Sequence, residues 1–231
     1  MNALVTQMHN VRSEQFHCAN LRLHGGEVGV VCVKSLEQGM AFVDAMMGLK
    51  APMEGRVELL GTLLYELPES ARLSLLARTC HVGGGLVSNL KVWENLALPA
   101  LFHHLISAEE VERRLVAAME QIQNKDDWLQ NRLKALPDTL STYSRRMVGL
   151  LRCAIQRPQL IVAEFLLDDL EEGPVDKLVK MLVWLKSQAP DMAVLLVNLG
   201  PIDAGHLALQ NLKAAWIVEL EEPHHAVSEK H

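Results

Sequence analysis

Short apolar segments alternate along the chain with segments of helical periodicity. Runs such as Gln159–Ala163 and Met192–Val197 contain few polar positions, which is typical of strands in a parallel sheet that is buried on both faces. The predicted strands are Ala19–Leu23, Glu27–Cys32, Arg56–Leu60, Thr79–Val82, Gln159–Ala163, Met192–Val197 and Trp216–Leu220. The pattern predicts an α/β protein with a mainly parallel sheet and an antiparallel β portion at the N-terminus.

Helices are predicted between these strands. The helical segments run from Ser35 to about Met47, over Pro68–Ala77, from Val92 to about Gln123, from Ser141 through Gln156, and over Val175–Ser187. Gly48 is expected to cap the first of them at its C-terminal end. Between two strands, residues from about 86 to 156 form a helical insertion with a polar, loop-like segment at Asp126–Leu140. We expect one domain over residues 1–231, with this insertion as a subdomain and residues 221–231 as a polar tail.

Composition and charge narrow the classes of function. The 231 residues are 49% hydrophobic and 22% charged, the balance of an ordinary globular protein. The net charge of −6 argues against nucleic acid as a partner, because phosphate backbones select basic surfaces. No apolar run approaches the ~20 residues needed to cross a bilayer, and Met1–Ser13 lacks the features of a signal peptide. We therefore expect a cytoplasmic protein that is soluble or peripheral to a membrane.

Neither the cysteines nor the histidines predict a metal site. The four cysteines form no C-x-x-C pair, and three of them lie in apolar surroundings where reduced core residues are expected; the four are Cys18, Cys32, Cys80 and Cys153. The adjacent pairs His103-His104 and His224-His225 are expected on the surface, because neighbouring side chains diverge on a helix or strand. The acidic run Asp168–Glu172 could suggest a divalent metal, but an exposed acidic turn is the preferred interpretation.

The stretch Gly26–Phe42 has the order of a phosphate-binding P-loop, with an apolar strand, a short connection and a helix. The usual sequence, G-x-x-x-x-G-K-[ST], aims backbone N–H groups and a lysine at phosphates. Here Val33, Leu36 and Gln38 stand at the glycine positions and Gly39 at the lysine position. The frame of a P-loop is present without its phosphate-binding residues.

Ser35 and Gln38 offer another interpretation of this stretch. Their spacing predicts a capping box, in which both side chains satisfy N–H groups of the helix itself. Glu37 adds a negative charge that would repel an anion at the helix N-terminus. Lys34-Ser35 is superficially similar to the K-[ST] pair but lies about five residues early. The helix end is therefore expected to function without phosphate.

Taken in order, several segments resemble the ATP-binding subunit of ABC transporters over nearly the whole chain. The segments that carry this resemblance are Gly26–Val28 with Gly48-Leu49, Gly55–Gly61, Leu90–Pro99, Leu140-Ser141 with Arg145, Leu150, Arg152 and Pro158, Leu160–Ala163, and Ala193–Val197. The resemblance implies a P-loop NTPase-like fold in which the insertion at 86–156 is the helical subdomain. A narrower likeness to the lipid-transport branch associated with mammalian-cell-entry proteins rests on the central region.

The positions on which that family depends for nucleotide chemistry differ in this chain. The resemblance puts Val82 at the glutamine of the Q-loop, Phe165 at the catalytic glutamate and Leu199 at the switch histidine. Glu164 stands at the metal-binding aspartate and could in principle still hold a metal ion. The vestigial nucleotide-binding positions are Val33, Lys34, Ser35, Gly39, Met40 and Ala41 in the Walker A region and Ser141, Thr142 and Tyr143 in the signature region. Phosphoryl transfer depends on positioning and charge neutralisation, so these joint losses predict that hydrolysis is absent or strongly impaired.

The leading hypothesis is a degenerate ATP-binding subunit, a pseudo-ATPase that serves as a structural or regulatory partner of a membrane permease. It would lie on the cytoplasmic face of the membrane, dock through the surface around Gly83–Ala108, and form a homodimer or pair with another ABC ATPase subunit. No cofactor is expected. A first alternative is an unorthodox but active ATPase that uses ATP and Mg²⁺ to power transport, with lipid as a candidate substrate. A second alternative is a soluble protein-interaction module that is derived from the ABC fold and no longer takes part in transport.

Overall fold

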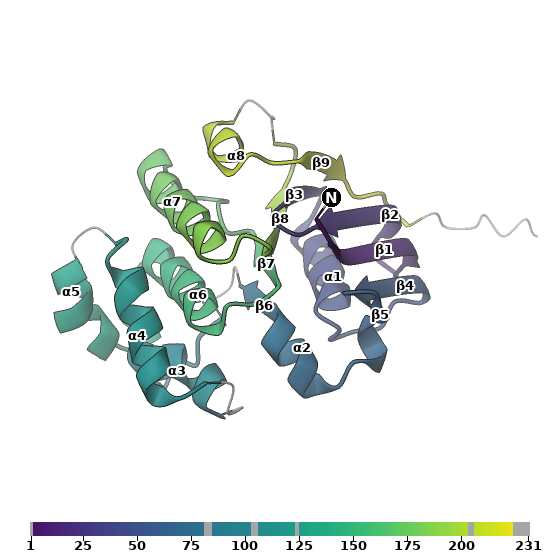
Figure 1. Ribbon diagram of the computed structural model, residues 1–231. Coiled ribbons are helices and arrows are strands. Elements are labelled where there is room, and N and C mark those ends of the chain that lie inside the picture. The colour runs from purple at the N-terminus through teal and green to yellow at the C-terminus, as the bar shows by residue number, and fades with distance from the viewer. Residues whose placement is uncertain (1, 81–84, 103–105, 123–124, 203–205, 224–231) are drawn as a thin grey trace, which may run out of the picture.

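The computed structural model describes residues 2–80, 85–102, 106–122, 125–202 and 206–223, and two sheets organise them (Figure 1). The smaller sheet is antiparallel with the order β2-β1-β4-β5, and the larger is parallel with the order β6-β7-β8-β3-β9. The antiparallel strands are β1 (Leu4–Arg12), β2 (His17–His24), β4 (Glu54–Leu59) and β5 (Thr62–Leu63). The parallel strands are β3 (Val28–Val33), β6 (Leu76–Thr79), β7 (Leu160–Glu164), β8 (Ala193–Leu199) and β9 (Trp216–Glu219). The predicted α/β class and both kinds of sheet are confirmed.

The parallel sheet is buried on both faces, as the apolar runs predict. Along β3, Val28, Val30 and Cys32 belong to one hydrophobic core, whereas Val31 and Val33 belong to the other. The same alternation holds in β7 and β8, because successive side chains of a strand point to opposite faces. Each polar position in these strands would therefore require a partner inside the protein.

The helices divide between the two cores. The helices are α1 (Leu36–Met46), α2 (Glu69–Leu75), α3 (Val92–Phe102), α4 (Ala108–Met119), α5 (Lys125–Gln130), α6 (Thr142–Gln156), α7 (Glu172–Gln188) and α8 (Leu207–Leu212). Buried residues of α1 pack between the two sheets, and those of α3, α4, α6, α7 and α8 share the opposite core. Figure 1 shows α3, α4 and α5 grouped at one end of the molecule, where the helical insertion was predicted.

Some predicted boundaries are wrong. The strand expected at Thr79–Val82 is β6, which pairs with β7 from Leu76 to Thr79, so the preceding helix ends at Leu75. Residues 81–84 lie outside the described part of the chain. Helix α7 begins at Glu172 rather than Val175, because a proline in the first turn removes only an N–H group that has no helical partner.

Two helices were not predicted. The segment 126–140, expected to be loop-like, contains most of α5 and two short 3₁₀ turns, because Trp128 is buried in the core and orders the chain around it. Helix α8 follows β8 and buries Ala208, Leu209 and Leu212. Among the described residues, no helix is both long and apolar enough to cross a membrane.

Candidate functional site

The Val33–Ala41 stretch passes from strand to helix with no room for an extended loop. Ser35 has an extended backbone and caps α1, with its Oγ accepting from the N–H of Gln38 at 3.1 Å. The amide oxygen of the buried Gln38 accepts from the N–H of Lys34 at 2.8 Å. One half of the predicted capping box is therefore confirmed. The other half is wrong by one residue, because Gln38 satisfies an N–H group just before the helix cap.

Two residues that follow β9 form hydrogen bonds with side chains at the N-terminal end of α1. The carbonyl oxygen of Glu221 accepts from Gln38 Nε2 at 3.2 Å and from the backbone N–H of His17 at 3.1 Å. Lys34 Nζ donates to Glu222 Oε1 at 2.9 Å, and this hydrogen bond raises the pKa of Lys34 and lowers that of Glu222. Lys34 is thus paired with a carboxylate at the surface. The start of the predicted polar tail is part of the site.

Gly39 and Phe165, the two positions that the resemblance assigns to the Walker A lysine and the catalytic glutamate, are in contact. A Cβ atom added to Gly39 would lie 2.3 Å from Cζ of Phe165 and 3.1 Å from a methyl group of Val33. The Phe165 ring is 1% exposed and its backbone is left-handed, with φ 47°. An apolar ring thus occupies the space beside Gly39. Met40 is 42% exposed and Ala41 is partly buried.

Glu164 is held by a guanidinium group and is 3% exposed. Arg78 Nη2 donates to both of its carboxylate oxygens at 2.9 Å, and Arg78 Nε donates to Oε2 at 3.1 Å. Arg78 Nη1 also lies 3.3 Å from Asp44 Oδ1 on α1. The positive charge that a metal ion would supply to Glu164 comes from a side chain of the neighbouring strand, so Glu164 is a structural ion-pair partner. No metal-binding group of His, Cys, Asp and Glu is found among the described residues.

The signature positions lie at the start of α6. Ser141 is the N-cap and accepts from the N–H of Ser144 at 3.3 Å, and Thr142 is exposed. Tyr143 is half-buried, with Lys177 Nζ 5.8 Å from its ring centre, and burial raises the pKa of its hydroxyl. Among the described residues, no hydrogen bond or ion pair joins these three positions to the Val33–Ala41 stretch.

Arg146 is a buried cation of α6, with a side chain that is 2% exposed. Its Nη1 donates to the carbonyl oxygen of Leu166 at 3.0 Å and to that of Asp168, and burial lowers the pKa of its guanidinium. The start of the acidic run Asp168–Glu172 is therefore hydrogen-bonded through its backbone to a buried guanidinium group.

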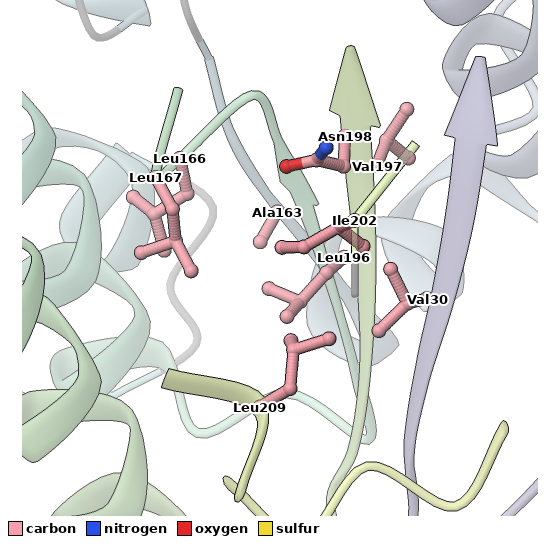
Figure 2. Close-up of a pocket in the computed structure, with 9 residues that line it drawn as sticks. All are labelled: Val30, Ala163, Leu166, Leu167, Leu196, Val197, Asn198, Ile202 and Leu209. Carbon is pink, nitrogen blue, oxygen red and sulfur yellow. The ribbon is translucent and has the colours of Figure 1, made fainter. Parts of the chain in front are cut away.

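Leu199, which the resemblance puts at the switch histidine, lies at the end of β8 beside β3. Leu199 pairs with Val33 across β8 and β3, and its N–H donates to Asp168 Oδ2 at 3.0 Å. Its side chain is 39% exposed. Val82, the Q-loop position, lies outside the described residues. A small cavity lies beside β8, and Figure 2 shows the side chains that line it. Its volume is about 10 Å³, roughly the size of one water molecule. It is lined almost entirely by aliphatic side chains and is far too small for a nucleotide.

Two functional contacts could not be found from the sequence. Arg78 lies on a strand whose other residues are mostly apolar, and a charge in that setting signals that a partner exists without naming it. Gln38 stands where a glycine is expected, and its long-range hydrogen bond to the carbonyl oxygen of Glu221 leaves no trace in the local sequence pattern.

Sequence comparisons find relatives that are named as ATP-binding proteins. No family model matches the chain. The chain is 32% identical over 148 residues to the uncharacterized ABC transporter ATP-binding protein YbbA of Escherichia coli, covering 62% of this chain and 61% of YbbA. It is 26% identical over 150 residues to the lipoprotein-releasing system ATP-binding protein LolD of Psychrobacter arcticus, covering 63% of each. These matches span about three-fifths of the length of each relative.

Solved structures match over more of the chain. The dimeric ATP-binding cassette MJ0796 bound to ADP and Pi has a TM-score of 0.75 at 18% identity, covering 94% of both chains. The cassette cbiO1 of Clostridium perfringens, described as part of the transporter complex cbiONQ, has a TM-score of 0.75 at 12% identity, covering 95% of this chain and 86% of cbiO1. The chain therefore has the fold of these two proteins. Its homologues are the ATP-binding proteins of ABC transporters.

Replacing Gly39 by alanine tests the contact with Phe165. Helix propensity alone would make Gly39→Ala stabilising by ~0.5–1 kcal/mol, but overpacking against the ring should destabilise the protein by ~1–3 kcal/mol. Urea unfolding measures the difference. Gly173→Ala is the matched control, because an added Cβ there meets nothing within 4 Å in the first turn of α7. A Gly39→Ala protein at least as stable as the wild type would contradict the close packing.

Removing Arg78 tests the internal ion pair. Arg78→Met leaves the Glu164 carboxylate buried without its partner, which should cost ~3–5 kcal/mol of unfolding free energy. Arg78→Met with Glu164→Leu should cost less than Arg78→Met alone, because no buried charge remains. Arg12→Met is the control, since the Arg12–Glu54 pair is exposed and should contribute ~0–1 kcal/mol. Equal losses for Arg78→Met and Arg12→Met would show that Glu164 does not depend on Arg78.

Proposed function

We propose that this protein is a pseudo-ATPase, a degenerate ATP-binding subunit that acts as a structural or regulatory partner of a membrane permease. The observation that carries the proposal is the contact between Gly39 and Phe165. In an active cassette these positions would supply a cation to the phosphates and a carboxylate to the attacking water. A ring packed on a glycine provides neither, and a general base is worth roughly 10²–10⁴ in rate.

The surrounding contacts support the same proposal. Phosphates bind a helix N-terminus through its unsatisfied N–H groups. At the N-terminus of α1, Ser35 Oγ accepts a hydrogen bond from one of these N–H groups, that of Gln38. The side-chain amide of Gln38 accepts from the N–H of Lys34 and donates to the carbonyl oxygen of Glu221. Arg78 takes the carboxylate of Glu164, which the alternative of an active ATPase would require for a metal ion. The internal pairing favours the pseudo-ATPase over that alternative.

The proposed place of the protein is the cytoplasmic face of a membrane, as a homodimer or in a pair with a competent ATPase subunit. Its homologues are named as ATP-binding proteins of transporters, and a cassette with the same fold is described as dimeric. The proposed docking surface lies in the helical insertion, where the apolar side chains of Val87, Trp93 and Leu98 are 47%, 40% and 42% exposed.

Titration with ATP tests the loss of nucleotide chemistry. In calorimetry we expect no saturable heat from ATP up to millimolar concentration, with or without Mg²⁺, because the helix end and Glu164 have internal partners. A competent cassette measured in parallel is the positive control. Tight saturable binding, or Mg²⁺-dependent phosphate release that Glu164→Ala abolishes, would establish the active ATPase instead.

Co-purification tests the transport partner. The chain should remain associated with the membrane subunit encoded beside it when the pair is expressed together and extracted in mild detergent. Trp93→Asp should reduce the recovered permease, since it puts a charge on the proposed docking surface. Val116→Asp is the control, because Val116 is 51% exposed on α4 outside that surface. Failure of the wild-type pair to associate would favour an interaction module that no longer takes part in transport.

A further inference from the structure

A groove of about 620 Å³ lies between α7 and α8. Small-molecule sites have volumes of about 300–1,000 Å³. The groove is on the face of the parallel sheet opposite α1, because the buried residues of α7 and α8 belong to the other core. Its deep end is formed by Leu167, Asn198 and Ile202, which also line the small cavity in Figure 2. It is therefore separate from the Gly39–Phe165 contact.

The walls of the groove are mainly apolar. Residues one helical turn apart on α7 line one side, and residues of α8 and of the segment after β8 line the other. Several of these hydrophobic side chains pack on the core but remain partly exposed: Leu167, Leu170, Val175 and Ile202. A ligand with an apolar body would cover them and remove that area from water.

Three carboxylates and one imidazole line the groove. The carboxylates are those of Asp168, Glu172 and Asp176, the imidazole is that of His206, and no lysine or arginine is among the described residues that line it. Lys180 Nζ lies 2.7 Å from Asp176 and offsets that charge. Glu172 is exposed in the first turn of α7. A cationic group at this end of the groove would be attracted by Glu172.

From this combination of volume, apolar walls and negative charge, we propose that the groove binds a small amphiphilic cation. Its ammonium group lies toward Glu172, and its apolar body lies between Val179 on α7 and Ala208 on α8, with Ile202 beneath. Neither the fold nor the degenerate nucleotide stretch requires such a site. The proposal is independent of whether the protein is a pseudo-ATPase.

Octylammonium, octanol and octanoate share one tail and differ in charge, so together they test the proposal. Calorimetry on the full chain, below the aggregation concentration of each probe, should show saturable one-to-one binding of octylammonium, weaker binding of octanol and none of octanoate. Glu172→Gln should weaken octylammonium about two- to fivefold, the range of an exposed charge pair, and leave octanol unchanged. Glu112→Gln, which removes an exposed carboxylate of α4, should alter neither.

Asn211 is exposed and lines the groove from α8, so it provides the blocking variants. Asn211→Trp should fill the groove and abolish saturable binding of octylammonium at an unchanged melting temperature. If the tryptophan variant does not fold, Asn211→Lys puts a cation at the rim and should weaken octylammonium more than octanol. Equal affinity for octylammonium and octanol, unchanged binding in a folded Asn211→Trp protein, or no saturable binding in the wild type would each overturn the proposal.

Discussion

Burial of the parallel sheet on both faces is the constraint on which the rest of the structure depends. Val28 to Val33 alternate between two cores, and β7 and β8 do the same. Parallel strands bring their carboxyl ends to one edge, so this burial also places Val33, Glu164 and Leu199 close together. In the open α/β sheets of enzymes this edge is where ligands bind. Here the edge is filled by the protein's own side chains.

The buried carboxylate of Glu164 at that edge has an internal partner, and the reason is electrostatic. A carboxylate that is 3% exposed cannot remain charged at low cost without a nearby cation. Arg78 provides that cation from the adjacent strand, and Asp44 on α1 holds the far side of the guanidinium. The result is a closed charge network in which a metal ion would have to displace a side chain.

Phe165 and Gln38 also make internal contacts at this edge of the sheet. Phe165 follows a buried strand and enters the core between the sheets, where the ring fits only because residue 39 has no side chain. Gln38 is long enough to bond Lys34 and Glu221, so the helix end and the segment after β9 are held together. At Gly39 and at Gln38, a residue that departs from the P-loop pattern is thus matched by an internal contact.

The sequence alone determined the alternation of strands and helices and the insertion of helices between two strands, because these depend on local periodicity and on order along the chain. It indicated the cap at Ser35 for the same reason. The tertiary structure decided the pairing of Arg78 with Glu164, 86 residues apart, and of Gln38 with Glu221, 183 residues apart. It also decided that Arg146 is buried and that Trp128 orders a helix in a polar segment. Such contacts depend on which strands become neighbours and on which space is left to fill, and no local pattern records either.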